Sequence, residues 1–266
     1  MTLDAFDAAA ATYDVDFTDS AVGRAQREQV WRALAPLLAG PPQRVLELNC
    51  GTGADAVHMA QAGHTVLATD RSPAMIAATR AMVQRAGLAQ RVRTAPLDLM
   101  APALPAGEGP FDLVLSDLGG LNCIDVDGLA RVGRFVASVL GPGGRFVAVL
   151  MADRCLLETI YYLLRAQPSS AFRRWTREAV DVPVGDCTVP TWYHPPSTLR
   201  HAFGPSFILE DLRPIGLFVP PGYLGPRVRH RPRLLHLLGR MDRFFAQASG
   251  LARLGDHVLI QFRRSA

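Results

Sequence analysis

The chain has 266 residues, an apolar content of 49% and a formal net charge of +4, and all 28 of its basic side chains other than histidine are arginine. This length fits one domain, or one domain with an elaborated cap, and the absence of lysine excludes Schiff-base and lysine-nucleophile chemistry. No apolar run reaches the roughly 18 residues of a membrane-spanning helix, and the acidic N-terminal segment does not resemble a signal peptide. The four cysteines are scattered without a Cys-x-x-Cys pair, which argues against a zinc site or a disulfide framework and predicts a cytoplasmic protein.

The charge is unevenly distributed along the chain. Residues 1–150 hold 12 arginines and 15 acids, whereas residues 151–266 hold 16 arginines and 9 acids. We interpret the basic half as a solvated face of an arginine-rich protein. An anionic substrate, an acidic membrane surface and nucleic acid remain the alternative explanations.

The first two thirds of the chain alternate between strand and helix patterns. Residues 1–41 predict an N-terminal helical lid, with a helix over 22–39 that Gly40-Pro-Pro42 ends. Strands are predicted near 44–50, 65–70, 92–98, 111–117 and 145–151, and helices near 54–62, 73–86, 127–140 and 153–165. This alternation predicts an α/β fold in which residues 42–165 form a doubly wound, mostly parallel sheet with helices on both faces.

After residue 165 the pattern changes. Residues 166–206 are rich in proline, arginine and aromatic residues and predict a cap insertion, which includes a short helix over 196–203 with Ser197 as its N-cap. Residues 207–266 are expected to complete the sheet: 207–219 as a strand pair or one bent strand, 232–249 as an inserted amphipathic helix, and 256–264 as a last, antiparallel strand. The apolar side of the 232–249 helix is broad, and we favour its packing on the protein's own body over docking on an anionic membrane.

The most informative segment is Arg44-Val-Leu-Glu-Leu-Asn-Cys-Gly-Thr-Gly-Ala-Asp-Ala56. A buried strand leads through Gly51 and Gly53 into a helix, and the free N–H groups at a helix start suit a nucleotide cofactor. A second strand ends about 20 residues on in Asp70, where a ribose hydroxyl requires a carboxylate. The glycines also fit the weak dinucleotide fingerprint G-x-G-x-x-A. Glu47, ahead of them, favours S-adenosylmethionine instead, because that molecule carries an ammonium and a sulfonium.

In these residues the chain resembles the class I S-adenosylmethionine-dependent methyltransferases. Four further segments extend the resemblance in order: Asp70-Arg-Ser-Pro-Ala-Met75, Val92-Arg-Thr-Ala-Pro-Leu-Asp98-Leu99, Phe111-Asp-Leu-Val-Leu-Ser-Asp117 and Leu140-Gly-Pro-Gly-Gly-Arg-Phe-Val-Ala-Val149. The N-terminal Phe6-Asp-Ala-Ala-Ala-Ala-Thr-Tyr13-Asp14 is similar to the lead-in of small-molecule members such as the quinone-biosynthesis methyltransferases. The resemblance implies a Rossmann-like methyltransferase fold with a seven-stranded sheet. One position departs from it, since Asn49 stands where the family usually has glycine; asparagine tolerates left-handed backbone.

The resemblance implies a set of cofactor contacts. Asp70 is predicted to bind the ribose, Asp98 to accept from the adenine amino group, and Leu99 and Arg71 to flank the adenine ring. Glu47 is predicted near the methionine ammonium and Ser116 beside the sulfonium. Tyr13 is predicted as a lid contact, and Asn49, Gly51 and Gly53 form the loop. Arg27 is expected to be a surface residue of its helix rather than a partner of the methionine carboxylate.

The acceptor side is less constrained by the sequence. Asp117 and Asn122 are predicted to point toward the methyl acceptor. His194, in Trp192-Tyr-His-Pro-Pro196, is a candidate general base, with a turn residue before proline as the alternative. Tyr162, Tyr193 and Tyr223 are candidates for lining the acceptor pocket, and core packing is an equal alternative for Tyr162 and Tyr223.

These features together predict a methyltransferase that moves a methyl group from S-adenosylmethionine to O, N or C of a small, apolar or aromatic acceptor by in-line displacement. S-adenosylhomocysteine would be the product. A base is required only if the attacking atom must lose a proton early. The alternatives are a nucleic-acid or protein methyltransferase, a non-catalytic S-adenosylmethionine-binding protein and, less favoured, an NAD-dependent oxidoreductase. We expect no nucleic-acid partner and no metal, and the sequence does not indicate an oligomeric state.

Overall fold

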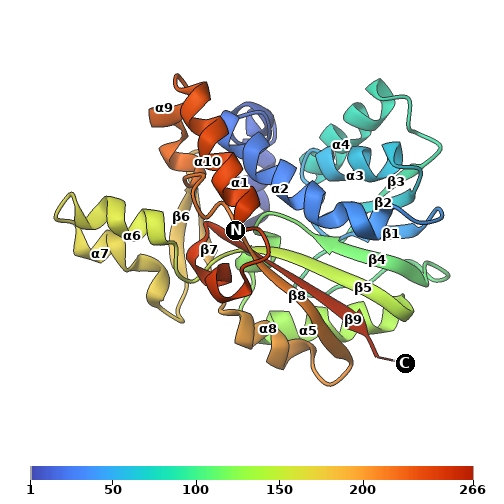
Figure 1. Cartoon of the computed structure of the whole chain (residues 1–266). Coiled ribbons are helices and arrows are strands. Elements are labelled where there is room, and N and C mark those ends of the chain that lie inside the picture. The colour runs from blue at the N-terminus through green and yellow to red at the C-terminus, as the bar shows by residue number, and fades with distance from the viewer. Residues whose placement is uncertain (1, 266) are drawn as a thin grey trace.

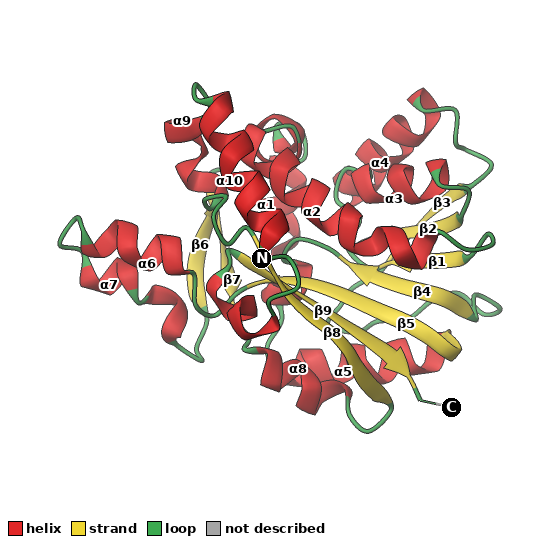
Figure 2. Cartoon of the chain, in the orientation of Figure 1, coloured by secondary structure: helices red, strands yellow, loops and turns green. Residues whose placement is uncertain are grey.

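The computed structural model describes residues 2–265, and its centre is a seven-stranded sheet of order β3-β2-β1-β4-β5-β9-β8 (Figures 1 and 2). The strands are β1 (Arg44–Glu47), β2 (Thr65–Asp70), β3 (Val92–Pro96), β4 (Phe111–Ser116), β5 (Leu140–Met151), β8 (Phe207–Ile215) and β9 (His257–Arg264). Strands β1, β2, β3, β4 and β5 are parallel to one another, and β9 runs antiparallel to both β5 and β8. The predicted doubly wound, mostly parallel sheet and its antiparallel last strand are confirmed.

Helices cover both faces of this sheet. They are α1 (Thr2–Ala9), α2 (Ala21–Leu38), α3 (Ala54–Gln61), α4 (Pro73–Arg85), α5 (Val126–Val139), α6 (Leu156–Leu163), α7 (Pro168–Ala171), α8 (Pro196–Phe203), α9 (Gly225–Val228) and α10 (Pro232–Phe244). Because side chains alternate along a strand, neighbouring residues of β1 enter different cores. Val45 packs in the core that α2, α3 and α4 cover, and Leu46 in the core that α5 and α8 cover.

Local signals explain where several helices begin. Ser20 caps α2 by accepting from the Gly23 N–H, Ser72 caps α4 ahead of Pro73, and Asp125 caps α5. The boundaries of these helices therefore fall within two residues of those predicted. Strand β5 begins at Leu140 and not at 145, because Leu140 already pairs with Phe111 of β4 before an irregularity in the ladder.

The cap contains a two-stranded hairpin of β6 (Val180–Val184) and β7 (Cys187–Thr191), which follows α6 and α7. The prediction that Ser197 caps α8 is wrong. Pro195 is the N-cap residue without a side-chain bond, and Pro196 occupies the first helical position, which its fixed φ suits.

Helix α10 differs most from expectation. It ends at Phe244, earlier than Ser249, and its packing on the body is only partial, since Leu237 and Phe244 are exposed. Its buried anchor is polar: Asp242 accepts from the backbone N–H groups of Phe218 and Val219. Among the described residues, no helix is long and apolar enough to cross a bilayer.

Candidate active site

A cavity of about 770 Å³ lies at the carboxyl ends of the parallel strands. Open α/β sheets bind ligands at this edge. One half of its wall comes from the loops after β1, β2, β3 and β4. The other half comes from α6, the β6–β7 hairpin, the segment around Tyr223 and the start of β9. The lid residues Phe6, Tyr13 and Phe17 also line it.

The glycine loop is held to the end of β2. The Gly51 N–H donates to one Asp70 carboxylate oxygen at 3.0 Å, and the Ser72 N–H donates to the other at 2.9 Å. Gly51 has φ +53°, and glycine adopts that conformation at little cost. Gly53 has φ +93°, does not line the cavity, and lies so close to Thr79 of α4 that a Cβ would come within 2.9 Å of it. Gly51 therefore shapes the wall, and Gly53 permits the loop to pack on α4.

Three predicted contacts line the cavity next to Asp70. Arg71 and Leu99 line it, and Asp98 lies 3.5 Å from the Arg71 Nε. Asp98 is partly exposed and accepts from the Met100 N–H, so one oxygen is already engaged. Burial raises the pKa of Asp70, although bonds from Ser72 and Gly51 act in the opposite direction.

Asn49 joins the ends of β1 and β4. Its Nδ2 donates to the Asp117 carbonyl at 2.7 Å, and its Oδ1 accepts from the Ser116 hydroxyl. The non-glycine residues with positive φ in the described chain are Leu118 and Ala166, so Asn49 is not in the left-handed region. Ser116 is fully buried and does not line the cavity. The structure thus places Ser116 as a partner of Asn49 and not in reach of a ligand.

Three carboxyl groups and one guanidinium are buried together beneath the loop. Arg27 of α2 forms ion pairs with Asp55 at the start of α3 and, at 3.7 Å, with Asp117 after β4. Burial opposes ionisation of Asp55, but the Arg27 charge and hydrogen bonds from Arg27 and Trp31 together lower its pKa. Burial and the Asp55 charge raise the pKa values of Glu47 and Asp117 well above the usual range. Asp55 is therefore the carboxylate that balances Arg27, and the raised pKa values of Glu47 and Asp117 favour their neutral forms.

The cluster leaves buried polar atoms without partners. Both Glu47 carboxyl oxygens, Asp117 Oδ2 and Arg27 Nε have no hydrogen bond. Unpaired buried polar groups cost free energy, so the two that belong to cavity-lining residues, Asp117 Oδ2 and Arg27 Nε, point to a ligand that supplies the missing partners. Arg27, Asp55 and Asp117 line the cavity, whereas Glu47 lies behind them. An ammonium next to Asp117 and a carboxylate next to Arg27 fit this set, so the residues suit the methionine end of S-adenosylmethionine.

The N-terminal segment is bonded to the same loops. Asp14 accepts from the Thr52 hydroxyl in the glycine loop, and Asp7 accepts from the Ser72 hydroxyl and the Ala74 N–H. Tyr13 lies against Gly51, where an added Cβ would be 3.8 Å from its ring, and burial raises its pKa to about 12. Tyr13 is therefore a neutral phenol over the loop at physiological pH.

The cap half of the cavity is aromatic and basic. Tyr162, Tyr193 and Tyr223 all line it, and the Tyr162 and Tyr223 rings stack with centroids 6.3 Å apart. The Arg173 guanidinium lies 5.2 Å from the Tyr223 ring and 6.0 Å from the Tyr162 ring. Burial raises the pKa values of Tyr193 and Tyr223, and the Glu158 carboxylate adds to the shift at Tyr223. Both are neutral phenols at physiological pH and poor proton acceptors.

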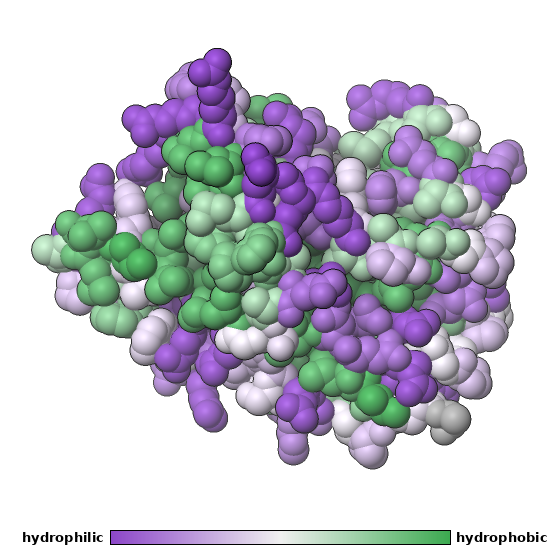
Figure 3. All heavy atoms as spheres, in the orientation of Figure 1, coloured by the Kyte–Doolittle hydropathy of each residue, from purple (hydrophilic) through white to green (hydrophobic). Residues whose placement is uncertain are grey.

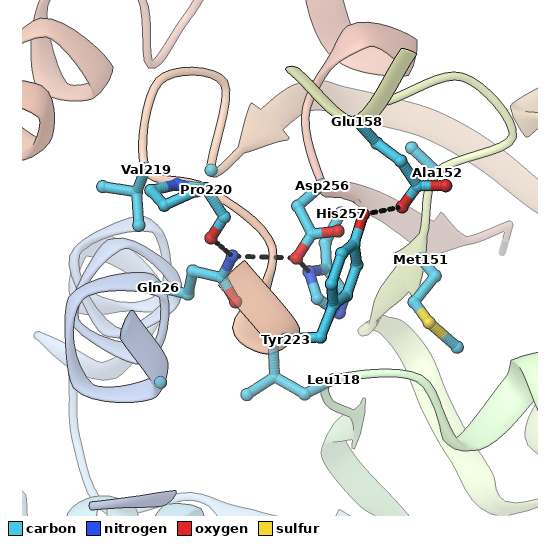
Figure 4. A network of polar contacts seen from close by, with 12 residues as sticks. Gln26, Leu118, Met151, Ala152, Glu158, Val219, Pro220, Tyr223, Asp256 and His257 are labelled. Carbon is cyan, nitrogen blue, oxygen red and sulfur yellow. Dashed lines mark hydrogen bonds and ion pairs between the residues drawn. The ribbon is translucent and has the colours of Figure 1, made fainter. Parts of the chain in front are cut away.

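Asp256 and His257, adjacent in sequence, enter the same half from the start of β9. His257 Nδ1 lies 3.3 Å from an Asp256 carboxylate oxygen, which also accepts from Gln26 at 2.9 Å (Figure 4). The other Asp256 oxygen pairs with Arg174 at 2.8 Å. Burial opposes ionisation of Asp256, yet His257 and Arg174 lower its pKa, so it is a carboxylate. Among the described residues that line the cavity, His257 is the one histidine.

Two predicted residues have other positions. His194 is buried, does not line the cavity, and its Nε2 lies 2.9 Å from the Ile124 carbonyl oxygen. The Asn122 amide is fully engaged with the Met151 and Trp192 backbone. This geometry argues against a base role for His194 and a substrate contact for Asn122. Both join the cap to the loop after β4.

The sequence is similar to those of known methyltransferases. A family model described as a methyltransferase domain matches residues 45–144. The demethylmenaquinone methyltransferases of Mycolicibacterium paratuberculosis and Mycolicibacterium gilvum are each 33% identical over 172 residues, which is 62% of this chain and 68% of theirs. The chain belongs to the class I S-adenosylmethionine-dependent methyltransferases. It is an enzyme of this class, and its cofactor is S-adenosylmethionine.

Solved structures match the fold of this methyltransferase over nearly its whole length. The DhpI-SAH complex has a TM-score of 0.58 and 21% identity, and covers 99% of this chain and 95% of its own. An S-adenosylmethionine-dependent methyltransferase from Mesorhizobium loti has a TM-score of 0.52 and 22% identity, covering 87% of this chain and 98% of its own. At such identities the likeness establishes the fold.

The methyltransferase site contains residues that the sequence reasoning missed. Arg27 was expected on the surface, but it is buried in the carboxylate cluster. From the sequence, Asp256 and His257 were assigned only to the last strand, although an aspartate and a histidine stand next to each other at the start of that strand. A His–Asp pair at the start of a predicted strand was the available signal. The strand was predicted to be antiparallel, and a strand antiparallel to β5 begins at the edge where the parallel strands end, so the pair could have been placed at the cavity.

Proposed function

We propose that this methyltransferase acts on a small aromatic acceptor that carries an acidic hydroxyl, of the hydroquinone class, and that His257 receives the proton. The observation that carries the proposal is one continuous cavity, with the cofactor-type residues at one end and three tyrosines with the Asp256–His257 pair at the other. The names of the demethylmenaquinone methyltransferase relatives support this acceptor class.

In the cofactor half, each role follows from the chemistry of the group. We assign Asp70 to the ribose hydroxyls, Asp98 to the adenine amino group, and Leu99 and Arg71 to the adenine faces. Asp117 would hold the ammonium and Arg27 the carboxylate of the methionine end, with Tyr13 and residues 1–41 as a lid. Glu47, Asn49, Ser116 and Gly53 would act from behind the wall by fixing the loops.

In the acceptor half, the tyrosine rings offer stacking surfaces to a planar ring. Aromatic pairs contribute about 0.5–1.5 kcal/mol beyond the area they bury. The Arg173 guanidinium beside Tyr162 and Tyr223 adds a positive charge that favours an oxyanion. We propose that the core, residues 42–165, holds the cofactor, except that its last helix α6 joins the cap, residues 166–206, and parts of 207–266 in selecting the acceptor.

The bound cofactor supplies a methyl group on a positively charged sulfur. The protein holds the acceptor in line with that methyl group and excludes water. His257 Nδ1 lies 3.3 Å from the Asp256 carboxylate without a hydrogen bond to it, and we propose that the Asp256 charge favours the protonated imidazole while Nε2 faces the acceptor hydroxyl. The hydroxyl proton passes to Nε2, the new bond forms from O or a ring carbon to the methyl group, and the electron pair of the broken C–S bond stays on sulfur. Methylation at carbon then releases the ring proton.

The other function classes have less support. A protein side chain or nucleic-acid base would have to reach an acceptor half that α6, the hairpin and Tyr223 surround. The two cavity cysteines are poor nucleophiles, since burial raises the pKa of Cys123 to about 11 and that of Cys50 well above its usual value.

A direct test is methyl transfer from S-adenosylmethionine to 1,4-naphthohydroquinones with a free ring position, under anaerobic reducing conditions, with the product identified by mass spectrometry. We expect a methylated product and calorimetric binding of S-adenosylhomocysteine. His257→Asn should lower turnover about 100-fold or more, and the matched exposed change His236→Asn should not. Binding of S-adenosylhomocysteine with no transfer to any hydroquinone would overturn the acceptor class. Full turnover of His257→Asn would overturn the base.

A further inference from the structure

The outer surface of α6 is apolar. Leu156, Ile160, Leu163 and Leu164 recur at the spacing of one helix face, and all four are exposed, Leu164 at 83%. Phe172 and Trp175, in the segment that follows α7, are exposed at 41% and 48%. We call these six residues the α6 face. Figure 3 shows apolar side chains gathered at the end of the molecule that α6 and α7 form, at the left of the view.

The fold fixes this face outward. Glu158, on the opposite side of α6, is buried and pairs with Arg173 and Arg174, and it accepts from the Tyr223 hydroxyl at 2.9 Å. Rotating the helix to bury its leucines would break these bonds. A surface helix usually buries its apolar face and exposes its polar face. Helix α6 does the opposite, since its polar anchor is buried and its apolar stripe faces water. An apolar surface of this kind marks an interaction site.

Arginines border the α6 face. The Arg165 and Arg227 guanidiniums lie 4.9 and 5.1 Å from the Tyr161 ring, and Arg154 lies 4.0 Å from the Trp175 ring. Arg165 and Arg227 are exposed, and neither forms an ion pair within residues 2–265. An apolar stripe bordered by aromatic rings and by exposed arginines such as Arg165 and Arg227 is the pattern of a helix that lies in the interface of an anionic membrane.

We propose that the α6 face docks on an anionic lipid surface. A symmetric second copy fits less well, because the same arginines from both chains would meet across the interface. The proposal does not depend on the acceptor. If the proposed function also holds, helix α6 contributes both to the docking face and, through Tyr162 on its other side, to the cavity wall.

The test is flotation of the full chain with vesicles of phosphatidylglycerol and phosphatidylcholine, against phosphatidylcholine alone. We expect binding that needs the anionic lipid and weakens with salt. Leu163→Asp and Leu164→Asp should each reduce binding about tenfold or more. Ile208→Asp is the matched control, since Ile208 on β8 and Leu163 are both 47% exposed. Arg165→Ser with Arg227→Ser should remove the dependence on anionic lipid.

Each variant is also assayed for S-adenosylhomocysteine binding and for methyl transfer to a water-soluble hydroquinone. Retained cofactor binding shows that a variant is folded, and retained transfer keeps the docking result separate from the proposed function. No vesicle binding by the wild-type chain, or equal loss in Ile208→Asp, would overturn the proposal. A concentration-dependent dimer that Leu164→Asp dissociates, without vesicle binding, would assign the face to a second copy.

Discussion

At the residue scale, the buried cluster of Glu47, Asp117, Asp55 and Arg27 makes cofactor binding depend on protons. The pKa values of Glu47 and Asp117 are raised because burial and the Asp55 charge oppose a second and third negative charge. An ammonium placed beside Asp117 favours the ionised form and lowers these pKa values. Binding should therefore release protons, and affinity for S-adenosylhomocysteine should increase with pH until the carboxyls of the free protein ionise.

The measurement is calorimetry at neutral pH in two buffers of different ionisation enthalpy. The wild-type protein should release protons on binding, and Asp117→Asn should release fewer. Asp127→Asn, an exposed change at the start of α5, is the control. Proton uptake by the wild-type protein would contradict the assignment of the ammonium to this cluster.

Asp70 carries a second residue-scale prediction. Asp70→Ala should remove a charge-assisted contact to ribose worth about 1.5–3 kcal/mol, or roughly 10- to 150-fold in affinity for S-adenosylhomocysteine. Asp70 also holds the Gly51 and Ser72 N–H groups, so Asp70→Asn is the informative second variant. The exposed Asp186→Ala should leave the affinity unchanged. A loss below threefold in both Asp70 variants would place the ribose elsewhere.

Sequence reasoning placed some residues well and others poorly for a physical reason. Asp70 ends β2 and Asp98 follows β3, and the ends of parallel strands meet at one edge of the sheet, so their position in the cavity was predictable. Arg27 depends on how α2 is rotated over the sheet, which its sequence does not specify. His194 follows Tyr193, which lines the cavity, but the His194 ring turns to the Ile124 carbonyl, and only the packed structure shows that.

At the scale of elements, the ion-pair network around Arg174 fixes α6 and the start of β9 to one another. Arg174 is buried and bonds both Glu158 and Asp256. Arg174→Met would leave the buried Asp256 without its arginine and Glu158 with Arg173 alone, and breaking a buried pair typically costs about 3–5 kcal/mol. Denaturant unfolding should show this loss. The exposed Arg177→Met should stay within about 0.5 kcal/mol of the wild type.

The same network sets the response of stability to acid. The cations and hydrogen bonds around Glu158 and Asp256 lower both pKa values in the folded chain, against the effect of burial. Their contribution is thus present above the unfolded-state pKa of about 4 and is lost as pH falls toward the folded values. Wild-type stability should decrease below about pH 4.5, and Arg174→Met should lessen this dependence. An unchanged acid slope in the variant would show that other carboxylates dominate.

The elements themselves were largely predictable, because apolar runs and capping residues define them locally. The exceptions have non-local causes. Helix α10 has a strong amphipathic pattern, yet it is anchored through Asp242 and leaves Leu237 and Phe244 exposed. Helix α6 is a second case, because a buried ion-pair network, and not its leucines, decides which side of the helix faces the protein. Periodicity predicts an apolar face but not what covers it.

At the scale of the whole molecule, a cavity wall built from the loops of the parallel sheet is joined to a cap of different construction. The core strands and their loops form one half of the cavity, and segments that follow β5 form the other. The family of the chain was predictable because five ordered segments of the core resemble it. In the other half, the candidates Tyr162, Tyr193 and Tyr223 do line the cavity, whereas Arg173, Asp256 and His257 were not predicted there.

This division predicts that cofactor affinity and acceptor kinetics can be changed separately. Tyr162 lines the acceptor half, is partly exposed and takes part in no hydrogen bond of its side chain within residues 2–265, so truncating it should be tolerated by the fold. Tyr162→Ala should raise the KM for a hydroquinone acceptor about tenfold through lost stacking and apolar area, with the Kd for S-adenosylhomocysteine within twofold of the wild type. Tyr162→Phe keeps the ring and should behave like the wild type. Asp70→Ala should show the reverse pattern.

Because both halves line one cavity, a ligand that spans them would couple the two measurements. Lost cofactor affinity in Tyr162→Ala, with the acceptor KM unchanged, would therefore mean that the ring contacts the cofactor and that the boundary between the halves lies on the other side of α6.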